Sequence, residues 1–430
     1  MASPDTPHLK RDIGFLGAML LVLNGLIGVG IFALPGKVAE NAGLLGPWLF
    51  LVIGLVFLAV VLVFAELSSY YERSGGPVLY AQEAFGPLAG FSTGWVLFVS
   101  RVTAFAANVT VMAIYLAAVV PWFDSDIGRA SVIVVFTTGL VVANVIGVRN
   151  GVRTMLVLSI LKLTPLLILI LAGLGEVTGA TLLPGGSLFF EDVGATSLVL
   201  IYAYVGFETI GITAGETRNP RSNLPRALVL TVLAVAILYF LVVLVFVSVI
   251  PPEDYAGATL ADVARRLAGP LGAVAITVAA VFSIGGNLSQ SILGAPRLLF
   301  SLAENGMVPK LFARVSPRFH TPDAAIIGMG ALALALALSG SFTQLAVASS
   351  LSRLLAYISC IAALPAVRRN ASDEVRRDAF RLRGGYLVPA VALLVCFWLL
   401  LQTSRENWVA VGLLLAVGLC LYLLERWLKK

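Results

Sequence analysis

The chain has 430 residues, of which 59% are hydrophobic and only 12% are charged, and it carries a net charge of +6. A soluble domain has roughly 25% charged residues and cannot hide so large an apolar fraction. The mean hydropathy of +0.97 therefore excludes a soluble enzyme, a disordered protein and a nucleic-acid binder. The apolar runs are continuous and far longer than a barrel strand, which favours helices. We expect an all-α polytopic membrane protein.

Apolar runs long enough to cross a bilayer recur along the whole chain. No cleavage site of small residues follows the first run, so we interpret it as a retained helix and not as a signal peptide. The sequence predicts twelve transmembrane helices, with both termini on one side of the membrane. Their expected ranges are 13–34, 45–67, 88–120, 129–147, 153–175, 194–214, 226–250, 270–302, 323–340, 343–366, 386–402 and 407–427.

The lysines and arginines are distributed unevenly between the connecting segments. Of the 29, 21 fall on the side of the termini, 5 in the opposite loops and 3 within spans. Basic loops are typical of the cytoplasmic side of a membrane. We therefore predict a multi-pass protein of the cell inner (plasma) membrane, in contact with the lipid bilayer. Residues 1–12 would form a cytoplasmic tail.

Several polar segments separate or follow these spans. We expect short surface helices on the cytoplasmic side at 77–86 and 304–318, and an amphipathic lid on the outer side at 251–269. The charge-rich stretch 367–385 is predicted to be a cytoplasmic loop. It would tether the ten helices before it to two peripheral helices and a short cytoplasmic tail in 386–430.

The first predicted helix contains three glycines at mid-membrane, Gly25, Gly28 and Gly30. Small residues let membrane helices pack closely, which is one interpretation of this pattern. The other is a helix that is unwound at Gly28–Gly30, because freed backbone groups are tolerated at that depth where they line a cavity. The sixth predicted helix has a matching feature, since aromatic residues flank Gly206 and Glu208 follows it.

Glycine-interrupted helices at corresponding places in two halves indicate a transporter built from inverted repeats. The ten-helix core, 13–366, would contain repeats at about 13–175 and 194–366. A half-helix that begins at Ile31 would offer free N–H groups and a positive dipole end to a carboxylate. Freed carbonyl groups of both broken helices could accept hydrogen bonds from an ammonium group. The two features together suit an α-amino acid.

Four of the ionisable residues within predicted spans stand out: Lys162, Arg101, Arg353 and Glu208. An unpaired charge at mid-bilayer costs roughly 2.5–3.5 kcal/mol, so such residues are functional candidates. Each also has a structural interpretation: Arg101 and Arg353 could pair with Glu208 or Glu66, and Glu208 could cap freed amides. Because a buried lysine can change charge near neutral pH, Lys162 is the best candidate for proton coupling, and Glu208 is the second coupling candidate.

Short motifs follow one another along the core. They are Gly28-Val29-Gly30-Ile31-Phe32; Glu66-Leu67 with Ser74-Gly75-Gly76-Pro77, Tyr80 and Phe85-Gly86-Pro87; Gly206-Phe207-Glu208 with Glu216, Asn219-Pro220, Asn223 and Pro225-Arg226-Ala227; and Arg297 with Glu304-Asn305-Gly306, Pro309, Phe312 and Thr321-Pro322. In this order and at these spacings they resemble the motifs of the amino acid–polyamine–organocation transporter superfamily. The resemblance covers residues 13–366.

The resemblance implies a LeuT-type fold, a five-plus-five inverted repeat with two peripheral helices, and a substrate held between the broken first and sixth helices. It also implies that Lys162 stands where sodium-coupled relatives bind an ion, which favours proton-coupled or sodium-independent exchange. Two positions depart from the family pattern. Val29 replaces a common serine, and Arg101 falls near the pocket wall, where it would repel cationic side chains or pair with Glu208. Asn287 replaces part of a bulkier wall, which argues against a dibasic substrate.

We expect the substrate to lie among residues of the first, third, sixth and eighth predicted helices. The candidates are Ile27, Gly28, Val29, Gly30, Ile31, Phe105, Asn108, Tyr202, Ala203, Tyr204, Gly206 and Asn287. The aromatic residues of the sixth helix could instead serve only to pack against neighbouring helices. An aromatic-lined pocket without an acidic group suits a neutral, small or aliphatic amino acid.

The sequence therefore predicts a secondary transporter of neutral L-amino acids, a symporter or antiporter that works by alternating access, with protons as the candidate coupling ion. The first, second, sixth and seventh helices would rock against the rest. An exchanger of polyamines or cationic amino acids is the alternative, and a channel or an intramembrane enzyme is a distant one. Cys360, Cys396 and Cys420 lie apart in apolar runs, so we expect no metal site and no cofactor.

Overall fold

The computed structural model describes residues 13–72, 75–147, 152–183 and 190–428. The predicted tail 1–12 lies outside this range, as does Ser74. The described residues form helices and contain no strand beyond one isolated bridge between Ile13 and Thr217. The structure thus confirms the all-α class.

The first half of the chain forms two short half-helices, four long helices and several short ones. They are α1 (Phe15–Leu26), α2 (Gly30–Ala42), η1 (Gly43–Leu45), α3 (Gly46–Ser69), α4 (Gly76–Phe85), α5 (Pro87–Ala117), η2 (Pro121–Asp124), α6 (Asp126–Ile146), α7 (Val152–Gly173), η3 (Leu174–Glu176) and α8 (Gly179–Leu182). The η elements are 3₁₀ turns.

The second half opens in the same way, with a broken helix, and then continues through longer ones. Its elements are α9 (Phe190–Tyr204), η4 (Phe207–Glu216), α10 (Pro220–Val249), η5 (Pro252–Asp254), α11 (Leu260–Glu304), η6 (Lys310–Ala313), α12 (Asp323–Ser339), α13 (Phe342–Asn370), α14 (Asp373–Asp378), α15 (Leu387–Leu401) and α16 (Arg405–Leu428). Each of the twelve predicted spans corresponds to one of these helices or to a broken pair.

The helices are long and apolar enough to cross a bilayer. Within the described chain, eight helical runs have at least 18 residues and contain a strongly apolar stretch. Four shorter apolar helices accompany them. The shorter ones include α1, which ends at Leu26 shortly before α2 begins. The chain is therefore an integral membrane protein.

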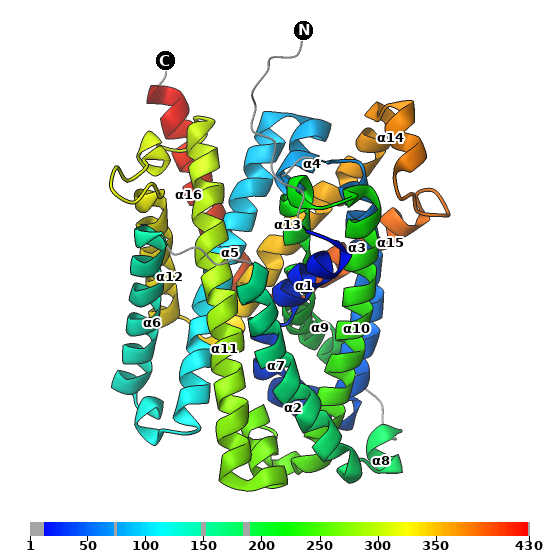
Figure 1. Cartoon of the computed structure of the whole chain (residues 1–430), viewed down its shortest axis with the longest axis vertical. Helices are drawn as coiled ribbons and strands as arrows, with labels where there is room; N and C mark the ends of the chain where they lie inside the picture. The colour runs from blue at the N-terminus through cyan, green and yellow to red at the C-terminus, as the bar shows by residue number, and fades with distance from the viewer. Residues whose placement is uncertain (1–12, 73–74, 148–151, 184–189, 429–430) are drawn as a thin grey trace.

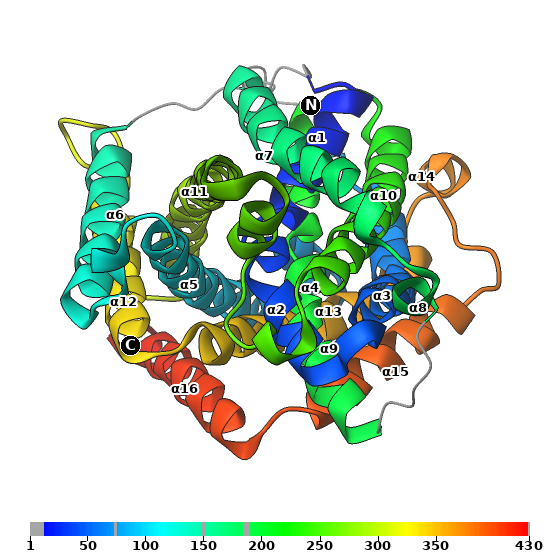
Figure 2. The same cartoon turned by 90° about the horizontal axis from the view of Figure 1, so that it is seen from below.

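The bundle has two faces that carry the connecting segments (Figure 1). We call the face with α4, α14 and the end of α16 the upper face, and the face with α8 and the first turns of α11 the lower face. Seen from below, α2 lies near the middle, whereas α6, α12, α15 and α16 lie at the periphery (Figure 2). α2, the second part of the broken first helix, is thus enclosed by other helices.

The amphipathic lid that the sequence predicts within 251–269 is a separate helix at the start of α11. The backbone leaves helical geometry at Ala268 and Gly269, where Gly269 has a φ of +67°. We call residues 260–267 the lid helix. At the upper face, the surface helix expected at 304–318 is limited to the single turn η6.

The predicted loop 367–385 is more ordered than expected. α13 continues to Asn370, and α14 forms a further short helix. The reason is a buried ion pair, because Arg368 donates two hydrogen bonds to Glu66 on α3, from Nε to Oε1 over 2.7 Å and from Nη2 to Oε2 over 2.8 Å. Glu66 also accepts a hydrogen bond from the amide of Leu382 over 3.1 Å, which fixes the end of the segment.

We expect Arg368→Ala to lower the free energy of unfolding by about 3–5 kcal/mol, because it leaves the carboxylate of Glu66 buried without its counter-ion. Thermal unfolding in detergent micelles measures the effect. Arg377→Ala is the control, since Arg377 is exposed on the same segment and surface changes are worth about 0.5 kcal/mol or less. Equal melting temperatures for the two variants would contradict a structural role for the pair.

Candidate functional site

The first transmembrane helix is interrupted where its glycines are. α1 ends at Leu26 and α2 begins at Gly30, so three residues between them are not helical. The close packing of neighbours requires glycine here, because a Cβ on Gly28 would lie 2.7 Å from Nδ2 of Asn287 and one on Gly30 would lie 2.7 Å from Cα of Ala203. The expected unwinding is therefore present.

The sixth helix is interrupted at the matching place. α9 ends at Tyr204, and a 3₁₀ helix, η4, begins at Phe207. Gly206 has a φ of +111°, a conformation that favours glycine. A Cβ on Gly206 would also clash with the carbonyl oxygen of Gly25, so the two interruptions meet backbone to backbone.

These interruptions leave main-chain groups unpaired inside the protein. No described residue accepts a hydrogen bond from the amides of Val29, Gly30 or Ile31 at the start of α2. Likewise, none donates one to the carbonyl oxygens of Tyr202 or Val205 at the end of α9. Donors that begin a helix suit a carboxylate, and free carbonyl oxygens suit an ammonium group.

A small cavity lies beside these groups. Its volume is about 40 Å³, which is room for roughly three water molecules. Its walls come from α1, α2, α5, α9, α11 and α13. The lining residues are Gly25, Leu26, Gly28, Val29, Gly30, Ala104, Asn108, Tyr202, Val205, Asn287, Ser291 and Arg353.

One wall of the cavity is a chain of hydrogen bonds between three helices. The hydroxyl of Tyr202 donates to Oδ1 of Asn108 over 2.5 Å, and Nδ2 of Asn108 donates to Oδ1 of Asn287 over 2.8 Å. Because each amide is held by a neighbour, the polar atoms of this wall are fixed in orientation before any ligand arrives.

A buried ionic group lies at another wall. Nε of Arg353 on α13 is 3.4 Å from Oε1 of Glu208. The other carboxylate oxygen of Glu208 accepts hydrogen bonds from the amide of Gly206 over 2.9 Å and from the hydroxyl of Tyr357 over 2.7 Å. Glu208 therefore both pairs with an arginine and caps the freed backbone, the two structural roles that the sequence suggested.

Arg101 reaches the same region from α5. Its side chain is buried beside Gly294 of α11, where an added Cβ would lie 3.2 Å from Nη1 of the arginine. It is close enough to interact electrostatically with Glu208 and Arg353. Among the described residues no carboxylate pairs with Arg101 directly. Two buried arginines thus share one buried glutamate near the cavity.

Lys162 on α7 contacts the broken first helix outside the lining of the cavity. Only 2% of the residue is exposed, and Nζ donates a hydrogen bond to the carbonyl oxygen of Ile27 over 2.8 Å. One turn away on α7, Oγ of Ser159 accepts a hydrogen bond from Nδ2 of Asn24 over 2.7 Å. The ammonium group therefore satisfies a carbonyl that the interruption of α1 has freed.

The predicted site residues do not all face the cavity. Gly28, Val29, Gly30, Asn108, Tyr202 and Asn287 line it. Ile27, Ile31, Phe105, Ala203 and Gly206 are buried around it without forming its lining. Tyr204 points elsewhere, because its hydroxyl donates to the carbonyl oxygen of Phe50 over 2.7 Å and its ring packs against Tyr239.

Some lining residues were not among the candidates from the sequence, although helical spacing could have indicated them. Ser291 lies four residues after Asn287, and Ala104 lies four before Asn108, so each pair shares one helix face. Gly25 lies one turn before Gly28. The described residues contain no group of three or more His, Cys, Asp or Glu placed to hold a metal ion.

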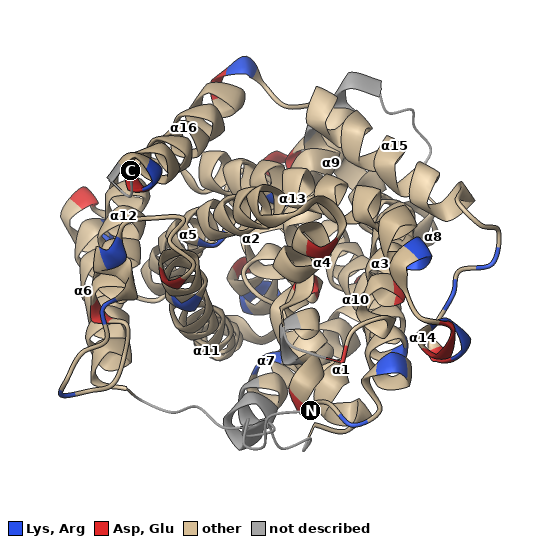
Figure 3. Cartoon of the chain, turned by 90° about the horizontal axis from the view of Figure 1, so that it is seen from above, with Lys and Arg blue, Asp and Glu red and all other residues tan. Residues whose placement is uncertain are grey.

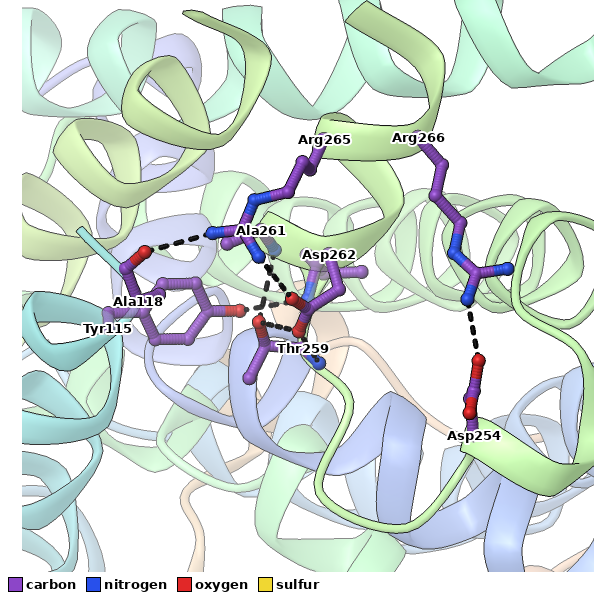
Figure 4. Close-up of polar contacts among 9 residues, drawn as sticks. Tyr115, Ala118, Asp254, Thr259, Ala261, Asp262, Arg265 and Arg266 are labelled. Atoms are coloured by element: carbon purple, nitrogen blue, oxygen red, sulfur yellow. Dashed lines mark hydrogen bonds and ion pairs between the residues drawn. The ribbon is translucent and has the colours of Figure 1, made fainter. Parts of the chain in front are cut away.

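On the lower face, the lid helix is fastened by two arginines (Figure 4). Nη1 of Arg265 is 3.1 Å from Oδ1 of Asp262, and its Nη2 donates to the carbonyl oxygen of Ala118 over 2.9 Å. Nη2 of Arg266 is 2.6 Å from Oδ2 of Asp254. Arg265 thus holds the lid helix against the end of α5, and Arg266 ties it to η5.

Tyr115 joins the lid helix to the broken first helix. Its hydroxyl donates to the carbonyl oxygen of Phe32 on α2 over 2.9 Å and accepts a hydrogen bond from the amide of Leu260 over 3.3 Å. The lid helix, α5 and α2 therefore meet on the lower side of the cavity.

The sequence is similar to known transport proteins over nearly its whole length. It is 28% identical to the serine/threonine exchanger SteT of Bacillus subtilis, over 96% of this chain and 95% of that protein. It is 27% identical to the branched-chain amino acid permease BcaP of Bacillus subtilis, over 98% and 94%. It is 26% identical to the human cystine/glutamate transporter, over 98% and 87%.

The family comparison agrees with the geometry of the broken helices. Residues 13–412 match the family model described as amino acid permease. The matched range includes both interruptions, the cavity between them and Lys162. The chain therefore belongs to the amino acid permease family, a family of transporters in the amino acid–polyamine–organocation superfamily.

Proposed function

We propose that this transporter carries small, neutral L-amino acids, with the substrate zwitterion bound between the two interruptions. The observation that carries the proposal is the set of free amides at the start of α2, at the edge of a cavity that also meets the free carbonyl oxygen of Val205. The first group would bind the carboxylate and the second the ammonium group. A transport role accounts for these features without any catalytic step.

The size and charge of the cavity support a small, uncharged side chain. Its volume of about 40 Å³, room for roughly three water molecules, is smaller than an amino acid zwitterion, so the site must widen on binding and a small side chain requires the least widening. The lining contains Arg353 and no acidic residue, so a cationic amino acid or a polyamine would meet a like charge. Serine/threonine and branched-chain amino acids, named for two relatives, fall within the proposed class.

An amino acid with an acidic side chain is the second candidate. The observation in its favour is the excess of positive charge, since Arg101 and Arg353 lie near a single glutamate, Glu208. A side-chain carboxylate of the substrate would restore the balance. This candidate needs a larger cavity than the one present.

Lys162 is proposed to couple transport to protons. Its ammonium group holds the carbonyl oxygen of Ile27, two residues before the free amides begin. Loss of a proton from Lys162 would weaken this contact and release the end of α1. Protonation would thereby change the backbone that holds the substrate, through one hydrogen bond.

Alternating access is proposed to move α1 with α2, α3, α9 with η4, and α10 as one group. α3 packs along α10, and α1 packs against both α10 and η4. The upper face, which has the larger share of the arginines, would be cytoplasmic in the cell inner membrane. On the lower face, several basic residues already pair with nearby acids, as in Lys37–Glu40.

We expect Gly30→Ala to reduce the apparent affinity for substrate roughly tenfold or more, because overpacking costs about 1–3 kcal/mol and would push α2 away from Ala203. Radiolabelled uptake into proteoliposomes measures this. Gly139→Ala is the matched control, since nothing lies within 4 Å of the Cβ that it adds. A Gly30→Ala protein that transports like the control would contradict the proposed site.

We expect Lys162→Ala to abolish the dependence of uptake on external pH, since no group then changes charge beside Ile27. Uptake into proteoliposomes between about pH 5 and 8 is the measurement. Lys310→Ala, which removes a lysine from the upper surface, should leave the pH response intact. The coupling role is wrong if Lys162→Ala responds to pH as the unchanged protein does.

Thermal-shift screening of the purified protein should show stabilisation by alanine and serine, weaker stabilisation by leucine, and none by lysine or putrescine. Ligands that bind only the folded state raise the melting temperature by mass action. Stronger stabilisation by glutamate than by alanine would establish the second candidate. Stabilisation by putrescine without any by amino acids would refute amino acid binding at this site.

A further inference from the structure

A second, larger cavity opens at the upper face, away from the broken helices. Its volume is about 650 Å³, within the range of ligand sites. Its walls come from the end of α13, the end of α4, α14 and the start of α15. The lining residues are Tyr70, Phe85, Ala362, Pro365, Ala366, Arg368, Arg369, Arg376, Arg381 and Tyr386.

One wall of this cavity is a stripe along α13. Ala362, Pro365, Ala366 and Arg369 are spaced by three or four residues, so they share one face of the helix. Ala366 is half-buried, and the other three are exposed. Along this face the surface changes from apolar to basic toward the end of α13. The surroundings of a membrane helix change in the same order, from hydrocarbon to lipid headgroups.

Some of the arginines that line the cavity have no carboxylate partner among the described residues. Arg368 is neutralised by Glu66, and Nη1 of Arg376 is 3.5 Å from Oδ1 of Asp373. Among the described residues, no carboxylate pairs with Arg369 or Arg381. The lining itself contains four arginines and no acid, and basic residues surround α14 in the view from above (Figure 3).

The walls are held in place by contacts that do not involve the two unpaired arginines. Arg368 donates from Nη1 to the carbonyl oxygen of Gly385 over 2.8 Å and lies 5.0 Å from the ring centroid of Tyr386. Nη1 of Arg221 is 3.1 Å from Oδ2 of Asp378, which ties α14 to the start of α10. The cavity is therefore a formed site whose free charges suit an anion.

We propose that this cavity binds the phosphate headgroup of an anionic phospholipid, with an acyl chain along the apolar stripe of α13. Arg369 and Arg381 would contact the phosphate, since arginine offers paired donors to its oxygens. Phe85 and Ala362 would contact the chain. A basic pocket between membrane helices at the cytoplasmic side is the surface that anionic headgroups recognise. A free phosphate would share the contact with the arginines and lack the contact of an acyl chain with the apolar stripe.

The test is native mass spectrometry of the delipidated full-length protein, titrated with dioleoyl phosphatidylglycerol. We expect one tightly bound lipid, and none with phosphatidylcholine of the same chains. Arg369→Gln/Arg381→Gln should weaken binding of that lipid roughly thirty-fold, from the usual contribution of two arginines near a membrane surface. Both side chains are exposed, so the variant should melt in detergent at the temperature of the unchanged protein.

Arg377→Gln/Arg383→Gln is the matched control, because it removes the same charge from the same segment outside the lining. Equal weakening by the two double variants would show diffuse attraction and overturn the site. A second arm adds inorganic phosphate and glycerol 3-phosphate in excess. Complete displacement of the lipid by either one would identify the ligand as a free phosphate and overturn the lipid proposal. Neither arm depends on transport, so the proposal can fail while the proposed function stands.

Discussion

A backbone that crosses a membrane must form hydrogen bonds with its own N–H and C=O groups. The structure of this protein depends on the two interruptions, after α1 and after α9, where these hydrogen bonds are missing. α1 and α9 each stop in mid-bundle, and the freed groups are enclosed by unbroken helices. Several of the freed groups have a specific hydrogen-bond partner. Lys162 donates to the carbonyl oxygen of Ile27, and the hydroxyl of Tyr239 donates to that of Leu26 over 3.0 Å. The carboxylate of Glu208 accepts from the amide of Gly206. What remains unpaired is the proposed recognition surface for the substrate.

The buried charges follow from the same constraint. Glu208 is stable in the interior because an amide, a phenol and a guanidinium surround it, so its cost of burial is offset by several partners at once. The ion pair of Glu66 and Arg368 stands apart from the cavity and has another effect: it draws a polar segment onto α3. Glu208 thus stabilises the interrupted backbone at the site, and Glu66 stabilises the polar segment at the upper face.

Local patterns predicted much of this architecture. Apolar runs predicted the helices, and the glycines near Gly28 and Gly206 predicted the interruptions, because a break depends on residues close in the chain. Contacts between distant residues escaped prediction. Arg368 appeared to belong to a loop, and its partner is 302 positions away. The direction of Tyr204 could have been predicted, because residues two positions apart on a helix do not share a face, and Tyr202 faces the cavity while Tyr204 contacts Phe50. Ser291 was within reach of the sequence, because it lies one helical turn after the predicted Asn287.

The clamp between Glu66 and Arg368 has a mechanical consequence. It joins the end of α3 to the end of α13 by two short hydrogen bonds, so these helices cannot separate at the upper face without breaking a buried ion pair. Any tilt of one against the other therefore has its fulcrum beside Glu66. Glu66 is the twenty-first of the 24 residues of α3, so the far end of the helix lies about 30 Å from it at about 1.5 Å per residue, and a tilt of about 10° would move that end by about 5 Å. Such a tilt of α3 would give its greatest displacement at the lower face.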